Sequence, residues 1–381
     1  MSDQFTEVTT EGWGSRLGGS LIAALIGLVL VPASIVLLYW NEGRAVDAIR
    51  ALNRAGAVIV EVSATAVDPK DDGKLVHATG MMQPTTPARD PVFGVTGDGV
   101  LRLKRTVEMY QWKEESHSQS TQSVGGSKTT ETTYTYQRVW SETPINSGQF
   151  KVPANHQNPP MPLRSATIDG GEVKLGAYRV DPSVLNRVAD FAPLQPQATP
   201  PSGYQAFGDG YYRGADSNQP AIGDVRVTFA SVPAQTVSVA AAQASGTLTA
   251  YRDTNGYTIA LAEPGAVSAA ILLKDEKKSE STLTWILRGV GFVVMLIGFV
   301  CMTQPLTMLF AVFPFLESLV GAGAFLVALT LAVPITLLTI AIAWIVHRPL
   351  IGIGLLVASA AAMFLLRWLH PRRTAPASRP A

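Results

Sequence analysis

The chain has 381 residues, of which 47% are hydrophobic and only 15% are charged, whereas about 25% of residues are charged in an average soluble protein. Its 30 basic and 29 acidic residues give a net charge of +1, which excludes a globally basic nucleic-acid-binding protein. The single cysteine, Cys301, excludes an intrachain disulfide framework and a cysteine-rich metal site.

The first apolar segment runs from Leu17 to Trp40 and contains no charged residue. Because about 20 apolar residues suffice to cross the hydrocarbon core of a bilayer, this segment predicts a transmembrane helix at 17–40, after an N-terminal tail at 1–16. A cleaved signal peptide is the alternative. It is disfavoured because the apolar run is too long and the residues before it are not basic.

The region 41–282 has ordinary charge density and predicts one large, strand-rich domain. Helical spacing continues from the first span to about Gly56, and alternation of apolar and polar residues then dominates. The Ser/Thr-rich segment from Ser116 to Thr130 predicts a mobile hairpin tip, and Asp181-Pro182 predicts the start of a short helix that runs to about Phe191. Strands are predicted at 58–67, 74–79, 99–112, 132–140, 225–232, 237–242, 247–252 and 257–261. Asn255-Gly256, between the last two, predicts a hairpin turn.

Three late apolar segments predict further transmembrane helices at 283–302, 318–346 and 350–366. A loop at 303–317 and a basic C-terminal tail at 367–381 complete the chain. The fold class is therefore an integral membrane α-helical protein with four spans and an α+β, strand-rich extramembrane domain. Four spans place both termini on one side of the membrane, and the arginines of the C-terminal tail favour a large domain outside the cytoplasm.

Three charged residues lie at the expected membrane boundary on the domain side. Glu42 and Arg44 follow Trp40 directly, and Arg288 lies about one turn inside the second span. A charge inside a membrane segment is costly, so we expect Glu42, Arg44 and Arg288 to form one polar cluster there. In the alternative, each arginine extends separately to the lipid headgroups.

A second candidate site lies within the large domain. Glu108, Tyr110 and Trp112 share one face of a predicted strand because side chains alternate with a period of two, and they form a candidate surface platform. A packed cross-strand face is the simpler alternative. The chain has no nucleophile motif, phosphate-binding glycine loop or histidine spacing for a metal. We therefore predict no catalytic, cofactor-binding or metal-binding residues, and no enzyme.

Several stretches resemble the LUMA family, that is, the transmembrane protein forty-three family and its prokaryotic relatives. The order of one early span, a large domain and three late spans is also similar. The resemblance covers most of the chain and implies a large domain in a lumen or extracytoplasmic space. It also implies a membrane organiser, which in animals binds itself, emerin and lamins. The similar stretches are WNEGRA (40–45), GKLVHATG (73–80), RTVEMYQW (105–112), HQNPPMP (156–162), GDVRVTF (223–229) and TWILRGVGF (284–292).

These observations predict a non-enzymatic, multi-pass membrane scaffold that self-associates and organises membrane or envelope partners through its large domain. The expected location is a bacterial cytoplasmic membrane, with membrane lipids and unidentified envelope proteins as partners and no nucleic acid. A lipid-binding or lipid-sensing protein is the main alternative. A transporter subunit is less favoured because the spans contain few charged residues, and a membrane-tethered hydrolase because no nucleophile and base are apparent.

Overall fold

The computed structural model describes residues 4–347, which form two units. Residues 4–12 and 50–279 build a strand-rich unit, and residues 13–49 and 280–347 build a helical unit. The predicted fourth span, 350–366, and the predicted basic tail, 367–381, lie outside the described residues.

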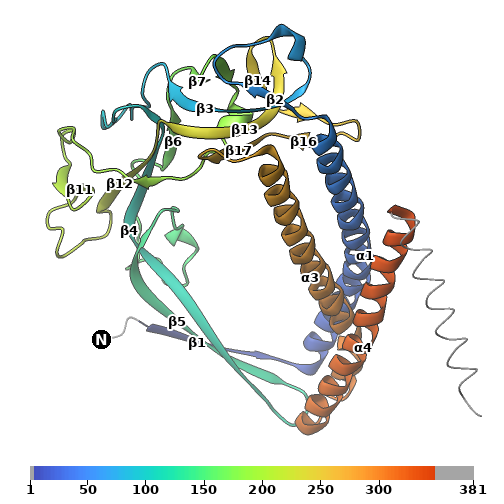
Figure 1. Cartoon of the computed structure of the whole chain (residues 1–381). Coiled ribbons are helices and arrows are strands. Elements are labelled where there is room, and N and C mark those ends of the chain that lie inside the picture. The colour runs from blue at the N-terminus through green and yellow to red at the C-terminus, as the bar shows by residue number, and fades with distance from the viewer. Residues whose placement is uncertain (1–3, 348–381) are drawn as a thin grey trace, which may run out of the picture. The chain divides into compact units, whose positions relative to one another are not determined.

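Three long helices dominate the helical unit (Figure 1): α1 (Trp13–Val58), α3 (Ala269–Leu309) and α4 (Pro314–His347). Each is long and apolar enough to cross a membrane, and together they contain the first three predicted spans. The predicted loop at 303–317 is much shorter in the structure, because α3 continues through Pro305 to Leu309 and α4 already begins at Pro314.

Small residues allow these helices to approach one another closely. A Cβ atom added to Gly27 of α1 would collide with the backbone of Gly298 on α3, and one added to Gly298 would collide with Val31. Close approach through glycine is a common way for membrane helices to associate, because backbone packing replaces a hydrophobic driving force that lipid cannot supply. On α4 the buried face consists of small residues: Ala324, Ala328, Ala332, Thr336, Thr339 and Ala343.

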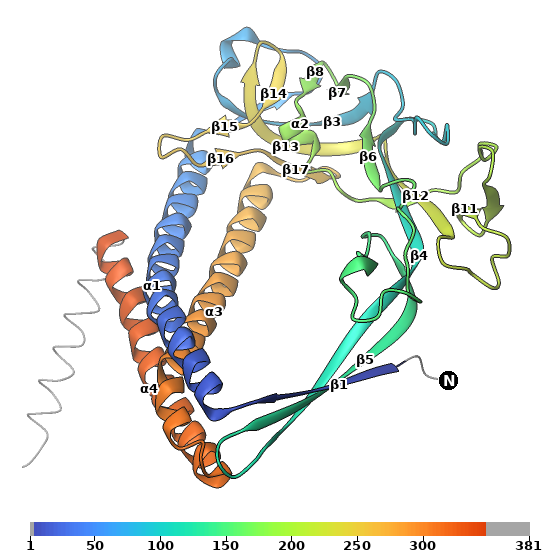
Figure 2. The same cartoon turned by 180° about the vertical axis from the view of Figure 1, so that it is seen from behind.

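One sheet of the strand-rich unit has the strand order β1-β5-β4-β12-β11-β10, with β6 pairing with β4 and β9 with β12. Figure 2 shows its long β4–β5 hairpin from behind. Its core gathers Phe93, Leu103, Val107, Met109, Tyr211, Val227 and Phe229. The strands are β1 Gln4–Glu11, β4 Val100–Gln122, β5 Lys128–Ser141, β6 Ala166–Asp169, β9 Ala192–Pro193, β10 Gln205–Phe207, β11 Gly210–Arg213 and β12 Val225–Pro233.

The second sheet closes on itself, because β13 pairs with both β14 and β3. The resulting small barrel runs β13-β14-β8-β7-β3, with β2 and β17 at its sides. Its core includes Val76, Leu101, Tyr178, Val184, Val237 and Leu248. The strands are β2 Val60–Ser63, β3 Leu75–Pro84, β7 Val173–Leu175, β8 Tyr178–Val180, β13 Gln235–Ala244, β14 Thr247–Thr249 and β17 Leu261–Pro264.

Two short elements agree with the local sequence signals. The helix α2 (Pro182–Leu185) is capped by Asp181, whose carboxylate accepts a hydrogen bond from the Ser183 amide at 2.9 Å. It is shorter than a helix reaching Phe191. The strands β15 (Tyr251–Arg252) and β16 (Thr258–Ile259) form the hairpin predicted from Asn255-Gly256, and Gly256 adopts a φ of 84° that other residues rarely tolerate.

The segment from Ser116 to Thr130 forms the predicted hairpin, but its two strands extend further towards the tip than the sequence analysis predicted. β4 continues to Gln122 and β5 begins at Lys128, so only a short turn separates them. The alternating Ser and Thr side chains form cross-strand pairs, including the Ser118 and Thr132 hydroxyls 2.9 Å apart. Threonine is β-branched and favours an extended backbone. A prediction from the Ser/Thr-rich composition alone does not take this preference into account.

The N-terminal tail is also more ordered than predicted. Gln4–Glu11 forms the edge strand β1, which pairs with β5 from Gln4↔Thr135 to Glu11↔Lys128. An ion pair between Glu7 and Lys151 joins the same edge at 2.7 Å. The side chains of β1 are almost entirely exposed, so backbone pairing rather than burial holds this strand. No apolar periodicity marks it in the sequence.

Candidate functional site

The structure brings Glu42 of α1 and Arg288 of α3 together in a two-pronged ion pair. The Nε and Nη2 atoms of Arg288 donate hydrogen bonds to the two carboxylate oxygens of Glu42 at 2.6 and 2.9 Å. The Glu42 side chain is only 2% exposed and that of Arg288 15%. The planar guanidinium of Arg288 can donate two parallel hydrogen bonds to a carboxylate, which a lysine ammonium cannot. The pairing compensates both charges where water is largely excluded.

Two tryptophans complete this ion pair. Trp344 of α4 donates its indole N–H to Glu42 at 2.8 Å. The guanidinium of Arg288 lies over the ring of Trp285 at 4.6 Å from its centroid, and at 5.8 Å from that of Trp344. Arg288 therefore has a carboxylate on one edge and aromatic rings against its faces, an arrangement that favours a cation. All three described helices contribute to this boundary cluster, defined here as Glu42, Trp285, Arg288 and Trp344.

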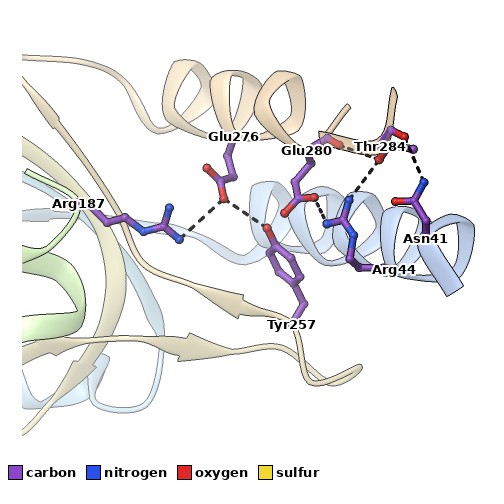
Figure 3. A network of polar contacts seen from close by, with 7 residues as sticks. All are labelled: Asn41, Arg44, Arg187, Tyr257, Glu276, Glu280 and Thr284. Carbon is purple, nitrogen blue, oxygen red and sulfur yellow. Dashed lines mark hydrogen bonds and ion pairs between the residues drawn. The ribbon is translucent and has the colours of Figure 1, made fainter. Parts of the chain in front are cut away.

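Arg44 belongs to a separate, adjacent set of contacts (Figure 3). Its guanidinium forms an ion pair with Glu280 and donates to the Thr284 hydroxyl at 3.3 Å. Asn41 donates to the backbone carbonyl of Thr284 at 3.1 Å. Of the predicted cluster of Glu42, Arg44 and Arg288, only Glu42 and Arg288 are therefore in contact. Arg44 pairs instead with Glu280, which lies about one turn before Thr284 on α3.

Within residues 4–347, two buried polar atoms near Arg44 have no hydrogen-bond partner: the Nε of Arg44 and the side-chain oxygen of Asn41. A buried donor or acceptor without a partner usually costs about 1–3 kcal/mol.

Figure 3 also shows a polar set in the strand-rich unit. The phenol of Tyr257 donates to Glu276 at 3.3 Å, and Arg187 lies 4.0 Å from the same carboxylate. Nearby, Arg54 forms an ion pair with Asp253, and hydrogen bonding from Arg54 lowers the pKa of that carboxyl despite its burial. These pairs link the parts of α1 and α3 in this unit to the hairpin of β15 and β16. We interpret them as contacts that stabilise the fold.

The candidate platform of Glu108, Tyr110 and Trp112 forms a half-exposed face, because the intervening Met109 and Gln111 are buried. Its residues are tied to neighbouring strands. Arg226 of β12 donates to Glu108 at 2.6 Å and also covers the Trp140 ring at 4.6 Å. The platform therefore combines the packed cross-strand face of the simpler alternative with exposed edges of the aromatic rings.

The platform continues across β5 and β11. Tyr110 contacts Trp140 at a centroid distance of 5.1 Å, and Arg138 lies over Trp112 at 5.5 Å. Tyr212 of β11 also packs on the Trp140 ring. Burial, together with a hydrogen bond to Asp224, raises the pKa of the Tyr212 phenol, so the phenol remains neutral and donates to that carboxylate.

Sequence reasoning missed Trp344 and Glu280. Trp344 lies near the end of an apolar segment, where tryptophan usually marks a membrane interface, but nothing local indicates that its indole faces Glu42. Glu280 lies about two turns before Arg288 on the same helix, and only the face it shares with α1 makes it the partner of Arg44. In the described residues, no group of three or more His, Cys, Asp or Glu side chains could hold a metal ion.

Long apolar helices linked by boundary ion pairs, together with a strand-rich extramembrane unit, define an integral membrane protein. The family model described as Transmembrane protein 43 matches residues 109–349, and the chain belongs to that family. Transmembrane protein 43 of rat is 32% identical over 91% of this chain and 90% of its own length. The Drosophila melanogaster homolog is 32% identical over 88% of this chain and 92% of its own length. The human protein is 31% identical over 93% and 91%, respectively. No solved structure matches the chain.

Proposed function

We propose that this chain is a non-enzymatic, multi-pass membrane scaffold that self-associates and gathers membrane or envelope partners through its large domain. The proposed location is a bacterial cytoplasmic membrane, with residues 41–282 outside the cytoplasm. The curated relatives named above are animal proteins, so the proposed location rests on the C-terminal arginines and the overall layout of the sequence.

The observation that carries this proposal is the half-exposed platform of aromatic and arginine side chains on the first sheet. Trp, Tyr and Arg are the residue types that dominate binding energy at protein interfaces. On the platform they are held rigidly by their neighbours, as shown by the contacts of Arg226 with Glu108 and Trp140. Because little side-chain entropy remains to be lost, a partner could bind there at a small ordering cost.

Self-association is proposed through open positions on α4. Within residues 4–347, Cβ atoms added to Gly321 and Gly323 would meet no atom within 4 Å beyond the nearby backbone of α4 itself, whereas Ala324, Ala328 and Ala332 are buried inside the unit. Two residues apart, these glycines point to nearly opposite sides of the helix, so a second copy could approach α4 closely at either of them, as small residues allow in membranes. The apolar side chains around it, including Leu319, Phe325 and Leu326, are exposed.

We expect two differently tagged full-length copies to co-purify from lipid nanodiscs formed directly from membranes. The double variant Gly321→Leu/Gly323→Leu should reduce recovery of the second copy by about tenfold, a loss of roughly 1.4 kcal/mol of association. Gly289→Leu is the matched control, since Gly289 is also an open helix glycine. Equal recovery for both variants would place self-association elsewhere, and a monomer at every protein density would refute it.

A further inference from the structure

A pocket of about 350 Å³ lies within the helical unit, between α1, α3 and α4. Its volume falls at the lower end of the range of about 300–1,000 Å³ for small-molecule sites. The polar lining comes from Glu42, Glu280, Ser281 and Arg288, and aromatic lining comes from Trp285 and Trp344. The pocket therefore includes the boundary cluster and also extends along α3 to Glu280 and Ser281.

The position of the pocket favours an amphiphilic ligand. Trp285 is 66% exposed and lies where the apolar part of α3 begins, as expected for an interfacial aromatic residue. Gly289 and Val293, one and two turns beyond Trp285 on the same side of α3, are also exposed, and Val293 is apolar. A ligand with its polar end in the pocket could therefore lay a hydrocarbon chain along this face of the helix.

The charges lining the pocket favour a headgroup that carries both signs. Glu42 and Glu280 contribute carboxylates, and Arg288 contributes a guanidinium. Because Glu42 pairs with Arg288 and Glu280 pairs with Arg44, the acids and bases at the site balance, and a headgroup with a net charge of either sign would leave that charge uncompensated. A zwitterion with its anionic end towards Arg288 and its cationic end towards Glu280 matches both.

Donor groups remain available for a phosphate. Arg288 uses Nε and Nη2 for Glu42, and its Nη1 has no partner among residues 4–347. The Ser281 hydroxyl, which is exposed and also lines the pocket, likewise has none in that part of the chain. Phosphate oxygens accept strong, charge-assisted hydrogen bonds from such donors.

A primary ammonium suits the other end better than a quaternary one. A carboxylate offers several acceptor positions, so Glu280 can accept a hydrogen bond from an ammonium group while it remains paired with Arg44. A choline group has no N–H to donate. The aromatic face of Trp285 that could bind choline is already covered by Arg288 at 4.6 Å.

We infer that this pocket binds the phosphoethanolamine headgroup of a membrane phospholipid. The phosphate accepts from Arg288 and Ser281, the ammonium donates to Glu280, and the acyl chains follow α3 past Trp285. This inference does not depend on the scaffold function, because a chain that never self-associates could still hold the lipid.

The test uses the full-length protein in nanodiscs made from equal parts of phosphatidylethanolamine, phosphatidylcholine and phosphatidylglycerol with identical acyl chains. After transfer to detergent, native mass spectrometry counts the lipids that remain bound. We expect phosphatidylethanolamine to be retained about tenfold over the other two lipids, as one hydrogen bond to a charged group can supply. Equal retention, or a preference for phosphatidylglycerol or phosphatidylcholine, would overturn the inference.

Variants then localise the binding. Ser281→Trp fills the pocket without altering either residue of the Glu42–Arg288 pair and should abolish the preference, and Ser281→Ala, which removes only the hydroxyl, should weaken it. Leu283→Trp is the matched control, because Leu283 is exposed on the same helix but does not line the pocket. Unchanged retention in both Ser281 variants would overturn the site.

A competition arm distinguishes the lipid from a soluble source of the same headgroup. Free glycerophosphoethanolamine lacks acyl chains and should displace the lipid only at a large molar excess. If it displaces the lipid at equal concentration, the acyl chains contribute nothing and the site belongs to a soluble compound rather than to a membrane phospholipid.

Discussion

Removing either partner of the Glu42–Arg288 pair is expected to destabilise the helical unit by about 3–5 kcal/mol, because the partner left behind is a buried charge without compensation. The expected variants are Glu42→Gln and Arg288→Gln, compared by unfolding in lipid nanodiscs. Glu42 is buried and Arg288 is only 15% exposed, so the small value of about 0–1 kcal/mol for an exposed ion pair does not apply.

The double variant Glu42→Gln/Arg288→Gln separates coupling from independent effects. It leaves no unpaired charge, and we expect it to be no less stable than either single variant. Arg288→Lys keeps the charge but loses the two-pronged geometry, so an intermediate loss is expected. Additive losses in the double variant would show that Arg288 and Glu42 act separately, as in the alternative of independent contact with headgroups.

The second large effect is expected in the strand-rich unit, at the ion pair of Asp90 and Arg105. Asp90 is fully buried, and Arg105 is 7% exposed at its side chain. Asp90 also accepts hydrogen bonds from the backbone amides of Val92 and Phe93, each at 2.8 Å. The carboxylate therefore fixes a loop as well as neutralising a buried arginine.

Asp90→Asn should cost about 3–5 kcal/mol of unfolding free energy, because Arg105 keeps its charge in a buried site. Urea unfolding of the full-length protein in detergent, followed by tryptophan fluorescence, measures the loss. Glu108→Gln is the control, since its partner pair with Arg226 is partly exposed and should change stability by no more than about 1 kcal/mol. Similar losses in the two variants would refute the distinction between buried and half-exposed pairs.

The sequence predicted those elements whose signal is local. Uncharged apolar runs gave the first three helices, and alternation located strands such as β4, β12 and β13 close to their observed starts. The burial alternation of Met109 and Gln111 against Tyr110 and Trp112 likewise follows from the period of two.

What the sequence could not predict depends on pairing between distant residues. Glu280 rather than Glu42 holds Arg44, and Trp344, far along the chain, completes the boundary cluster. β1 has no apolar face, so only its pairing with β5 defines it. The closing of β13 onto β3 into a small barrel is also a property of the complete sheet and not of either strand alone.

The β1–β5 pairing has a consequence for topology. If residues 17–40 cross the membrane completely, Gln4–Glu11 and the β4–β5 hairpin lie on opposite sides of it. Pairing of β1 with β5 requires them to lie on the same side. The crossing and the pairing therefore exclude each other. Cross-strand pairs contribute roughly 0.2–1 kcal/mol each. Burying one large apolar side chain contributes about 1.5–3 kcal/mol, and α1 exposes many, including Leu21, Ile22, Leu25 and Val29. In a membrane, the crossing is therefore expected to prevail over the pairing.

The central claim is that apolar helices cross the membrane and hold the large domain on one side of it. The most direct test of this claim is to measure on which side of the membrane each segment lies. One compartment-sensitive reporter is fused before Met1 and another is inserted at Gly125, in the turn between β4 and β5, in otherwise identical full-length proteins. We predict a cytoplasmic signal from the N-terminal reporter and an extracytoplasmic signal from the Gly125 reporter. Signals from the same side would show that β1 stays paired with β5 and that residues 17–40 do not cross, which would contradict the account.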